Sequence, residues 1–265
     1  MPAAPLLTLD HLEKRFAAGR GPAGSGLQAV QDVSLDVAPH DFVSLLGPSG
    51  CGKSTVLKMV AGLLPPTSGR IAWQAGAARS PADDIGFVFQ EPTLMPWASV
   101  FDNIWLPLRL EGMGRAEASP RVEAALRGVG LGDFADALPR ALSGGMKMRV
   151  SIARALITRP RLLLMDEPFA ALDEITRARL NDDTLSLWQA HGFTTMFVTH
   201  SVVEAVYLSR RIVVMAARPG RVVADIAIDE PYPRNAAFRH TPRFGAWCAE
   251  VSAELVRHAA DVPHG

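Results

Sequence analysis

The chain has 265 residues, enough to bury one sizeable α/β core, and its 27 Lys and Arg residues balance 27 Asp and Glu residues. This balance, without a strongly basic stretch, argues against a nucleic-acid-binding surface. No apolar run approaches the ~20 residues of a membrane span, and the start lacks a secretory pattern, so we expect neither a span nor a signal peptide. Two cysteines, Cys51 and Cys248, are too few for a disulfide framework and indicate reduced thiols in a cytosolic compartment.

The N-terminal part reads as an antiparallel β subdomain. Residues 6–16 and the alternating residues 33–37 are predicted strands, because alternation of apolar and polar residues is typical of half-buried strands. Residues 17–26, rich in Gly and small residues, are predicted to form an exposed turn. No internal repeat is evident in the chain.

The next segment has a strand, a glycine-rich loop and a helix in immediate succession. Residues 41–46 are predicted to form a short buried strand and residues 54–64 a helix that stops before two prolines. Glycines let successive backbone N–H groups point inward, and the helix start adds its positive dipole end. Lys53 would reach the β- and γ-phosphates, and the Ser54 hydroxyl would ligate Mg²⁺. The loop fits G-x-x-x-x-G-K-[ST] with Gly47, Pro48, Ser49, Gly50, Cys51, Gly52, Lys53, Ser54 and Thr55.

The middle of the chain is predicted to form a helical subdomain. A strand over residues 85–89 leads into Gln90, and helices are expected over residues 100–110 and 120–129. Trp97 lies in a proline-flanked loop between Gln90 and the first of these helices. A large apolar side chain there either binds a partner or is buried in the protein's own core. Both interpretations of Trp97 stay open.

A second glycine-rich segment, residues 142–146, precedes a predicted helix over residues 146–157. Ser143 is a good N-cap, and Gly144 and Gly145 allow close backbone approach. Exposed N–H groups at a helix start favour an anion, so the segment is either a second phosphate site or a merely capped helix. One nucleotide needs only one glycine-rich phosphate-binding segment. A second such segment therefore suggests that a nucleotide is held from two sides.

Two further strands are predicted to end in polar groups. Residues 161–165 end in Asp166, which would hold Mg²⁺ through water, and Glu167, which would polarise the attacking water as general base. Residues 194–199 lead into His200, whose imidazole can bond a γ-phosphate. Taken alone, Gln90 and His200 are better explained as ordinary polar strand caps, and their value as site residues lies in the set. Alternating strands and helices over residues 162–228 and an amphipathic helix over residues 244–259 complete the chain.

Taken together, these motifs resemble those of the ATP-binding cassette (ABC) family over most of the chain. The phosphate loop resembles its Walker A, Gln90 its Q-loop, residues 142–146 its signature motif, residues 161–167 its Walker B, residues 171–173 its D-loop and His200 its switch histidine. The resemblance implies a RecA-like P-loop NTPase core with an antiparallel β subdomain and an α-helical signature subdomain. It implies one ABC ATPase domain over residues 1–265, with residues 91–159 as the helical part and residues 1–90 and 160–265 as the core.

The resemblance also implies site roles and a partner subunit. ATP and Mg²⁺ are the implied cofactors. Phe16 is placed where such proteins stack an aromatic ring on adenine, and Asp173 of the D-loop is assigned to nucleotide binding. Ser143, Gly144 and Gly145 would bind the γ-phosphate of ATP held by a second ATPase subunit in a head-to-tail dimer. Catalysis is assigned to Glu167, His200 and Gln90, and metal binding to Ser54, Gln90 and Asp166.

Residues 94–103, 198–205 and 218–221 look most like the nitrate, sulfonate and taurine import subfamily. That likeness implies uptake of a small solute, an integral membrane permease docking near Gln90 to Asn103, a solute-binding protein, and a peripheral place on the cytoplasmic face of the inner membrane. The alternatives are an exporter or lipid-transport ATPase, or a soluble ABC ATPase acting on nucleic acid or ribosomes. Met146, Met148 and Ser201 depart from residues common in the family, which leaves the strength of the signature contact and the hydrolysis rate open.

Overall fold

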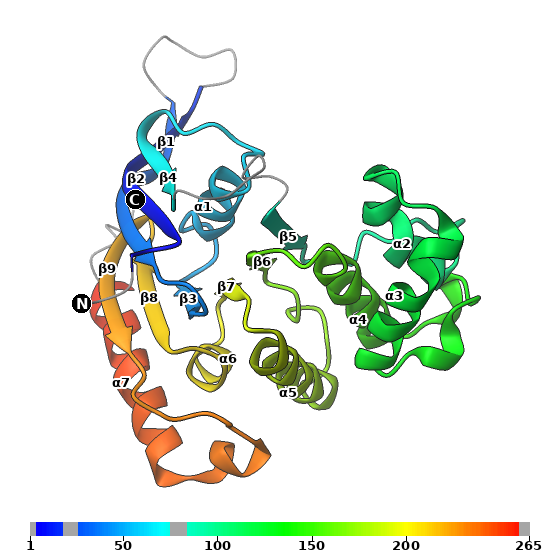
Figure 1. Ribbon diagram of the computed structural model, residues 1–265. Helices are drawn as coiled ribbons and strands as arrows, with labels where there is room; N and C mark the ends of the chain where they lie inside the picture. Colours follow the sequence, from blue (N-terminus) through cyan, green and yellow to red (C-terminus); the bar gives the residue numbers. More distant parts are fainter. Residues whose placement is uncertain (1–3, 18–25, 75–83, 260–265) are drawn as a thin grey trace. The chain divides into compact units, whose positions relative to one another are not determined.

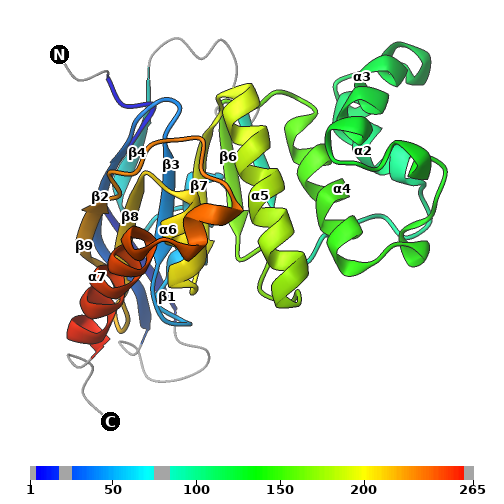
Figure 2. The same ribbon diagram turned by 90° about the horizontal axis from the view of Figure 1, so that it is seen from below.

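The computed structural model describes residues 4–17, 26–74 and 84–259. The chain divides into two compact units, Met1–Ala82 together with Thr194–Gly265, and Asp83–Phe193. Both units mix helices and strands, as Figures 1 and 2 show, which confirms the α/β class. None of the helices in the described ranges is long and apolar enough to cross a membrane.

The first unit begins with the predicted antiparallel sheet, whose strand order is β2-β1-β4. Its strands are β1 (Leu7–Phe16), β2 (Leu27–Val37) and β4 (Ser68–Trp73). The sequence placed the start of β2 six residues too late, at residue 33. Register shifts between β1 and β2 break the alternation there, although Leu27 still pairs with Phe16. Residues 18–25, most of the predicted turn, lie outside the described residues.

The same unit contains four strands in the order β7-β3-β8-β9. β3 (Phe42–Leu46) pairs in parallel with β7 (Thr194–Thr199) on one side and with β8 (Arg211–Ala216) on the other. β9 (Arg221–Ala227) runs antiparallel to β8. Every residue of β3 and β7 is buried, as expected for the near-continuous apolar sequences of strands covered on both faces.

The helices of the first unit are α1 (Lys53–Val60), α6 (Val202–Leu208) and α7 (Pro242–Ala259), with a short 3₁₀ turn, η4 (Ala236–His240). The predicted helix over residues 54–64 was too long. Gly62 adopts a left-handed conformation with φ +70, and the amide of Gly62 bonds the carbonyl of Met59, so the helix ends there rather than at the prolines. α7 packs along α6, β8 and β9, and begins two residues before the predicted position (Figure 2).

The second unit contains two parallel strands, β5 (Ile85–Val88) and β6 (Leu162–Asp166). Its helices are α2 (Val100–Leu110), α3 (Arg115–Gly128), α4 (Gly144–Leu156) and α5 (Glu174–His191), with short 3₁₀ turns η2 (Gly132–Phe134) and η3 (Pro139–Ala141). The predicted start of α3 at Pro120 was wrong. The helix begins at Arg115, and the amide of Ala118 already bonds the carbonyl of Gly114.

α2, α3 and α4 form one helical group (Figure 1). Their facing sides share one apolar core, which includes Val150, Ala153 and Ile157. Met146 packs against this core and Met148 is buried, so these two departures from the family pattern are apolar packing residues here.

Candidate functional site

The phosphate loop directly follows β3 and ends in α1, in the context that its sequence predicted. Gly50 and Gly52 have φ values of +78 and +89, which side-chain-bearing residues rarely adopt. Gly52 is also the N-cap of α1, without a side-chain cap. The loop therefore uses its glycines to bend the backbone, and it presents a helix start whose N–H groups and dipole favour an anion.

Lys53 is the charged group of this loop, and only 3% of its surface is exposed. Its Nζ donates to the carbonyl oxygens of Gly47 and Pro48, at 2.8 and 3.0 Å. The ammonium group is thus held over the loop by the loop's own backbone. Burial raises the pKa of the adjacent Cys51 thiol above its usual value, although the charge of Lys53 opposes this rise. Cys51 is completely buried and serves the loop as a small packing residue.

His200 follows β7, and β7 pairs with β3 so that Leu46 lies opposite Thr199. The phosphate loop and His200 therefore leave the sheet at the same edge and from neighbouring strands. The carboxylate of buried Glu204 accepts a hydrogen bond from the Thr199 hydroxyl at 2.5 Å, and the amide of Ser201 donates to the same hydroxyl at 3.0 Å. These two bonds fix the backbone on both sides of the exposed His200 side chain.

Ser201, the third departure from the family pattern, is the N-cap of α6. Its hydroxyl accepts the amide of Glu204 at 3.3 Å. Serine satisfies this position as well as aspartate does, because both offer an oxygen to the first turn of the helix.

Phe16 is the last residue of β1, and 39% of its surface is exposed. The Nζ of Lys14 lies 5.5 Å from the centre of its ring. A half-exposed ring at a strand end can offer one face to a planar group such as a base.

In the second unit, polar groups gather where β5 and β6 end. Val88 pairs with Met165, so Gln90 and the acidic pair Asp166 and Glu167 lie at the same edge of these parallel strands. Asp166 is the last residue of β6 and is almost fully buried, at 9% exposure. Amide and carboxylate oxygens at one edge are suited to a hard cation and to a water molecule.

Glu167 has a φ value of +46, an uncommon backbone conformation for a residue other than glycine. The amide of Ala170 donates to its carbonyl at 3.2 Å and closes a tight turn after the strand. Strained residues of this kind concentrate at functional sites, where the surrounding fold holds them in place. No residue pattern around Glu167 indicated this strain in advance.

The second glycine segment begins α4, and Ser143 caps it by accepting the amide of Met146 at 3.3 Å. Ser143 and Gly144 are exposed, whereas Gly145 is buried. A Cβ atom at Gly145 would lie 2.6 Å from the Cγ2 atom of Thr176, and one at Gly144 would lie 3.2 Å from the Cδ2 atom of Leu172. These glycines therefore serve close packing within the second unit, while the start of the helix stays accessible.

Asp173 is the N-cap of α5. Its carboxylate accepts the amide of Thr176 at 2.9 Å, and this hydrogen bond holds the pKa of Asp173 below its usual value. The carboxylate is thereby committed to the start of α5.

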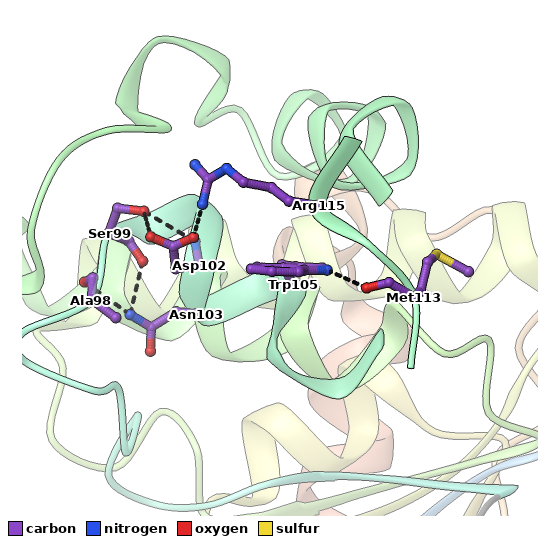
Figure 3. Close-up of polar contacts among 7 residues, drawn as sticks. All are labelled: Ala98, Ser99, Asp102, Asn103, Trp105, Met113 and Arg115. Atoms are coloured by element: carbon purple, nitrogen blue, oxygen red, sulfur yellow. Dashed lines mark hydrogen bonds and ion pairs between the residues drawn. The ribbon is translucent and has the colours of Figure 1, made fainter. Parts of the chain in front are cut away.

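The loop before α2 carries Trp97, which is 79% exposed, so the alternative of a tryptophan buried in the core was wrong. Fully buried Asn103 holds this loop. Its Nδ2 donates to the carbonyls of Met95, Ala98 and Ser99, and its Oδ1 accepts the amide of Met95. Figure 3 shows the side chain of Asn103 directed toward Ala98 and Ser99. Sequence reasoning missed Asn103, whose only signal was its place in the first turn of a predicted helix.

Arg115 ties the start of α3 to the same region. It forms an ion pair with Asp102 (Figure 3). Its guanidinium carbon also lies 4.3 Å from the centre of the Phe101 ring. The Trp105 indole donates to the carbonyl of Met113 at 3.1 Å. The exposed loop is thus built on a fixed base of side chains from α2 and α3.

The predicted site residues are divided between the two units. The first unit contains Phe16, residues 47–55 and His200, of which the structure brings the phosphate loop and His200 to one sheet edge. The second unit contains Gln90, Asp166, Glu167, Asp173 and the segment of Ser143, Gly144 and Gly145, of which it brings Gln90, Asp166 and Glu167 together. The first set can bind a phosphate chain, and the second can bind a metal and accept a proton.

The chain is also similar to known proteins over most of its length. The family model described as ABC transporter matches residues 30–170. An ATP-binding protein of Brucella abortus is 48% identical over 83% of this chain and 85% of its own. The taurine import ATP-binding protein of Rhizobium johnstonii is 46% identical over 84% of each chain. The aliphatic sulfonates import ATP-binding protein of Xanthomonas axonopodis is 44% identical over 78% of this chain and 83% of its own.

A solved structure supports the comparison at the level of the fold. The dimeric, post-hydrolysis form of the ATP-binding cassette MJ0796, bound to ADP and phosphate, is 31% identical, with a TM-score of 0.73. The matched region covers 85% of this chain and 100% of the solved chain.

Proposed function

Because the chain belongs to the ABC transporter family and is an ATPase of that family, we propose that it energises uptake of a small solute through a separate membrane permease. The observation that carries the proposal is Trp97, a largely exposed aromatic side chain on a loop fixed by a buried asparagine. Exposed aromatic residues on rigid supports are typical anchors of protein interfaces. The import relatives support the direction of transport.

In this proposal ATP binds first to the phosphate loop. Lys53 moves from the carbonyls of Gly47 and Pro48 to the phosphate oxygens, which are stronger acceptors because they are charged. The backbone N–H groups of residues 47–55 and the start of α1 supply the remaining donors. Phe16 stacks on the adenine ring with its exposed face.

Hydrolysis is assigned to polar groups at the strand edges. Glu167 accepts the proton of the attacking water, Gln90 orients that water, and His200 donates a hydrogen bond to the γ-phosphate. The hydroxyl of Ser54, the amide oxygen of Gln90 and the carboxylate of Asp166 are hard oxygen donors, so they fit Mg²⁺. When bound, Mg²⁺ neutralises charge that develops on the phosphates.

A second ATPase subunit is part of the proposal. Ser143, Gly144 and Gly145 bind the γ-phosphate of ATP held by that subunit, and Asp173 orders the adjoining segment from its cap position. The accessible helix start at Ser143 supports this assignment, as does the dimeric state of the solved cassette. The two copies lie head to tail.

The permease is assigned to the surface between Gln90 and Asn103. Gln90 lies in this segment, so a partner that contacts it acts next to a catalytic residue. The solute is proposed to be an oxyanion or organic sulfonate such as nitrate, an alkanesulfonate or taurine, delivered by a solute-binding protein. The subunit is then peripheral, on the cytoplasmic face of the inner membrane.

Reconstitution tests this function. The subunit is combined in proteoliposomes with its membrane permease, and uptake of radiolabelled taurine is measured with the solute-binding protein of that permease. We expect ATP-dependent uptake in the wild-type complex and loss of uptake with Trp97→Ala, while the ATPase activity of the isolated subunit stays unchanged. Efflux in place of uptake would contradict the importer assignment.

A further inference from the structure

The turn between β8 and β9 contains Gly220, in a segment that the sequence linked only to subfamily resemblance. Gly220 is joined to β2 by two backbone hydrogen bonds. Its amide donates to the carbonyl of Ala29 at 3.1 Å, and its carbonyl accepts the amide of Gln31 at 2.8 Å. The turn is therefore fixed to the β subdomain by its backbone, as an isolated bridge between Val30 and Gly220 also records.

The same glycine lies directly against the phosphate loop. A Cβ atom at Gly220 would be 2.1 Å from the carbonyl oxygen of Cys51 and 2.7 Å from that of Ala29. The φ value of Gly220 lies outside the left-handed region, so space alone excludes a side chain. Both nearest groups are backbone atoms, which cannot move aside as the end of a flexible side chain can.

Two glycines of the phosphate loop also pack closely against backbone atoms of neighbouring strands. A Cβ atom at Gly47 would be 2.4 Å from the carbonyl oxygen of Met215 in β8, and one at Gly52 would be 2.7 Å from that of Ala29 in β2. The backbone of the phosphate loop thus packs against backbone from β2, from β8 and from the turn that follows β8.

We propose that Gly220 is a positioning residue for the phosphate loop, and that its lack of a side chain lets the turn hold the Cys51 peptide in place. This inference rests on the proposed role of that loop in ATP binding. A methyl group at position 220 would meet the Cys51 carbonyl oxygen first, at 2.1 Å, and would therefore displace the Cys51 peptide. Displacing the Cys51 carbonyl rotates the peptide that carries the next N–H group, one of the donors expected to face the phosphates.

The test compares Gly220→Ala with Gly245→Ala, a matched control in α7 where a Cβ atom meets nothing within 4 Å. ATP affinity is measured by isothermal titration calorimetry. We expect Gly220→Ala to weaken ATP binding about ten- to hundredfold, the effect of losing one hydrogen bond to a charged group, and to raise KM with little change in kcat. The ATP-induced rise in Tm should shrink in this variant and stay at the wild-type value in the control.

Unchanged affinity in folded Gly220→Ala would overturn the proposal. Lys53→Ala is measured in parallel. If Lys53→Ala binds ATP normally, the proposed role of the loop fails; if only Gly220→Ala does, the positioning role alone fails. For the case in which Gly220→Ala does not fold, amide hydrogen exchange of the wild-type protein gives a second measurement. Residues 217–222 should gain protection with ATP, and no change there would refute the coupling of turn and loop.

Discussion

The phosphate loop and the signature segment are both glycine-rich helix starts, yet their glycines act differently. In the phosphate loop, Gly50 and Gly52 bend the backbone through left-handed conformations, and Lys53 is buried within the bend. In the signature segment, Gly144 and Gly145 are ordinary helical residues whose missing side chains allow close packing against Leu172 and Thr176. The first element is proposed to enclose an anion within its own subunit, whereas the second presents a capped helix start at the surface.

The largest expected effect breaks the enclosing element. Lys53→Ala should abolish measurable ATP binding, because the phosphate charge loses its main counter-charge. Lys58→Ala is the control, since Lys58 is an exposed lysine in the last turn of the same helix. Fluorescence titration with a labelled nucleotide checks both variants. Equal affinity of Lys53→Ala and the wild-type protein for the nucleotide would contradict the role of the phosphate loop in ATP binding.

The next effect separates binding from hydrolysis. Glu167→Gln should retain binding of ATP and Mg²⁺ but lose roughly 10²- to 10⁴-fold in ATP hydrolysis, the range expected for a general base. Glutamine keeps the size of the side chain and cannot accept the proton. Phosphate release under single-turnover conditions measures the loss, and wild-type turnover would rule out Glu167 as the base.

A smaller effect compares the glycines directly. Gly52→Ala should lower the free energy of unfolding by about 1–3 kcal/mol, because alanine is strained at φ +89 and its Cβ atom would meet the Ala29 carbonyl. Gly144→Ala should change that free energy by less than about 1 kcal/mol, because helical alanine is favoured and only the end of the Leu172 side chain must yield. Urea unfolding followed by circular dichroism measures both changes. An equal loss of unfolding free energy in the two variants would contradict the proposed difference between the two glycine-rich segments.

The sequence predicted the local elements well, because each was encoded by neighbouring residues. The loop at 47–55, the buried strands β3, β6 and β7, and the cap at Ser143 all followed from short patterns. The bends at the end of α1 and the early start of β2 were missed, because Gly62 and the bulged pairing of β1 with β2 override simple periodicity.

The supports of the candidate site could not be predicted from the sequence. Asn103 bonds backbone groups four to eight residues away, Glu204 bonds the hydroxyl before His200, and Gly220 packs against a loop formed much earlier in the chain. Each support depends on a contact that exists only after folding. The residues predicted to act in chemistry were visible as motifs, whereas the residues that hold them were not.

The central claim is that the signature segment binds ATP held by a second subunit. It is tested most directly by size-exclusion chromatography with light scattering in a Glu167→Gln background. That protein should form a dimer with ATP and stay monomeric with ADP, which lacks the γ-phosphate. Adding Ser143→Arg should block the dimer and leave nucleotide binding by the monomer intact, whereas adding Ala116→Arg, at an exposed position of α3, should leave the dimer unchanged. An ATP-dependent dimer that persists with Ser143→Arg would contradict the claim.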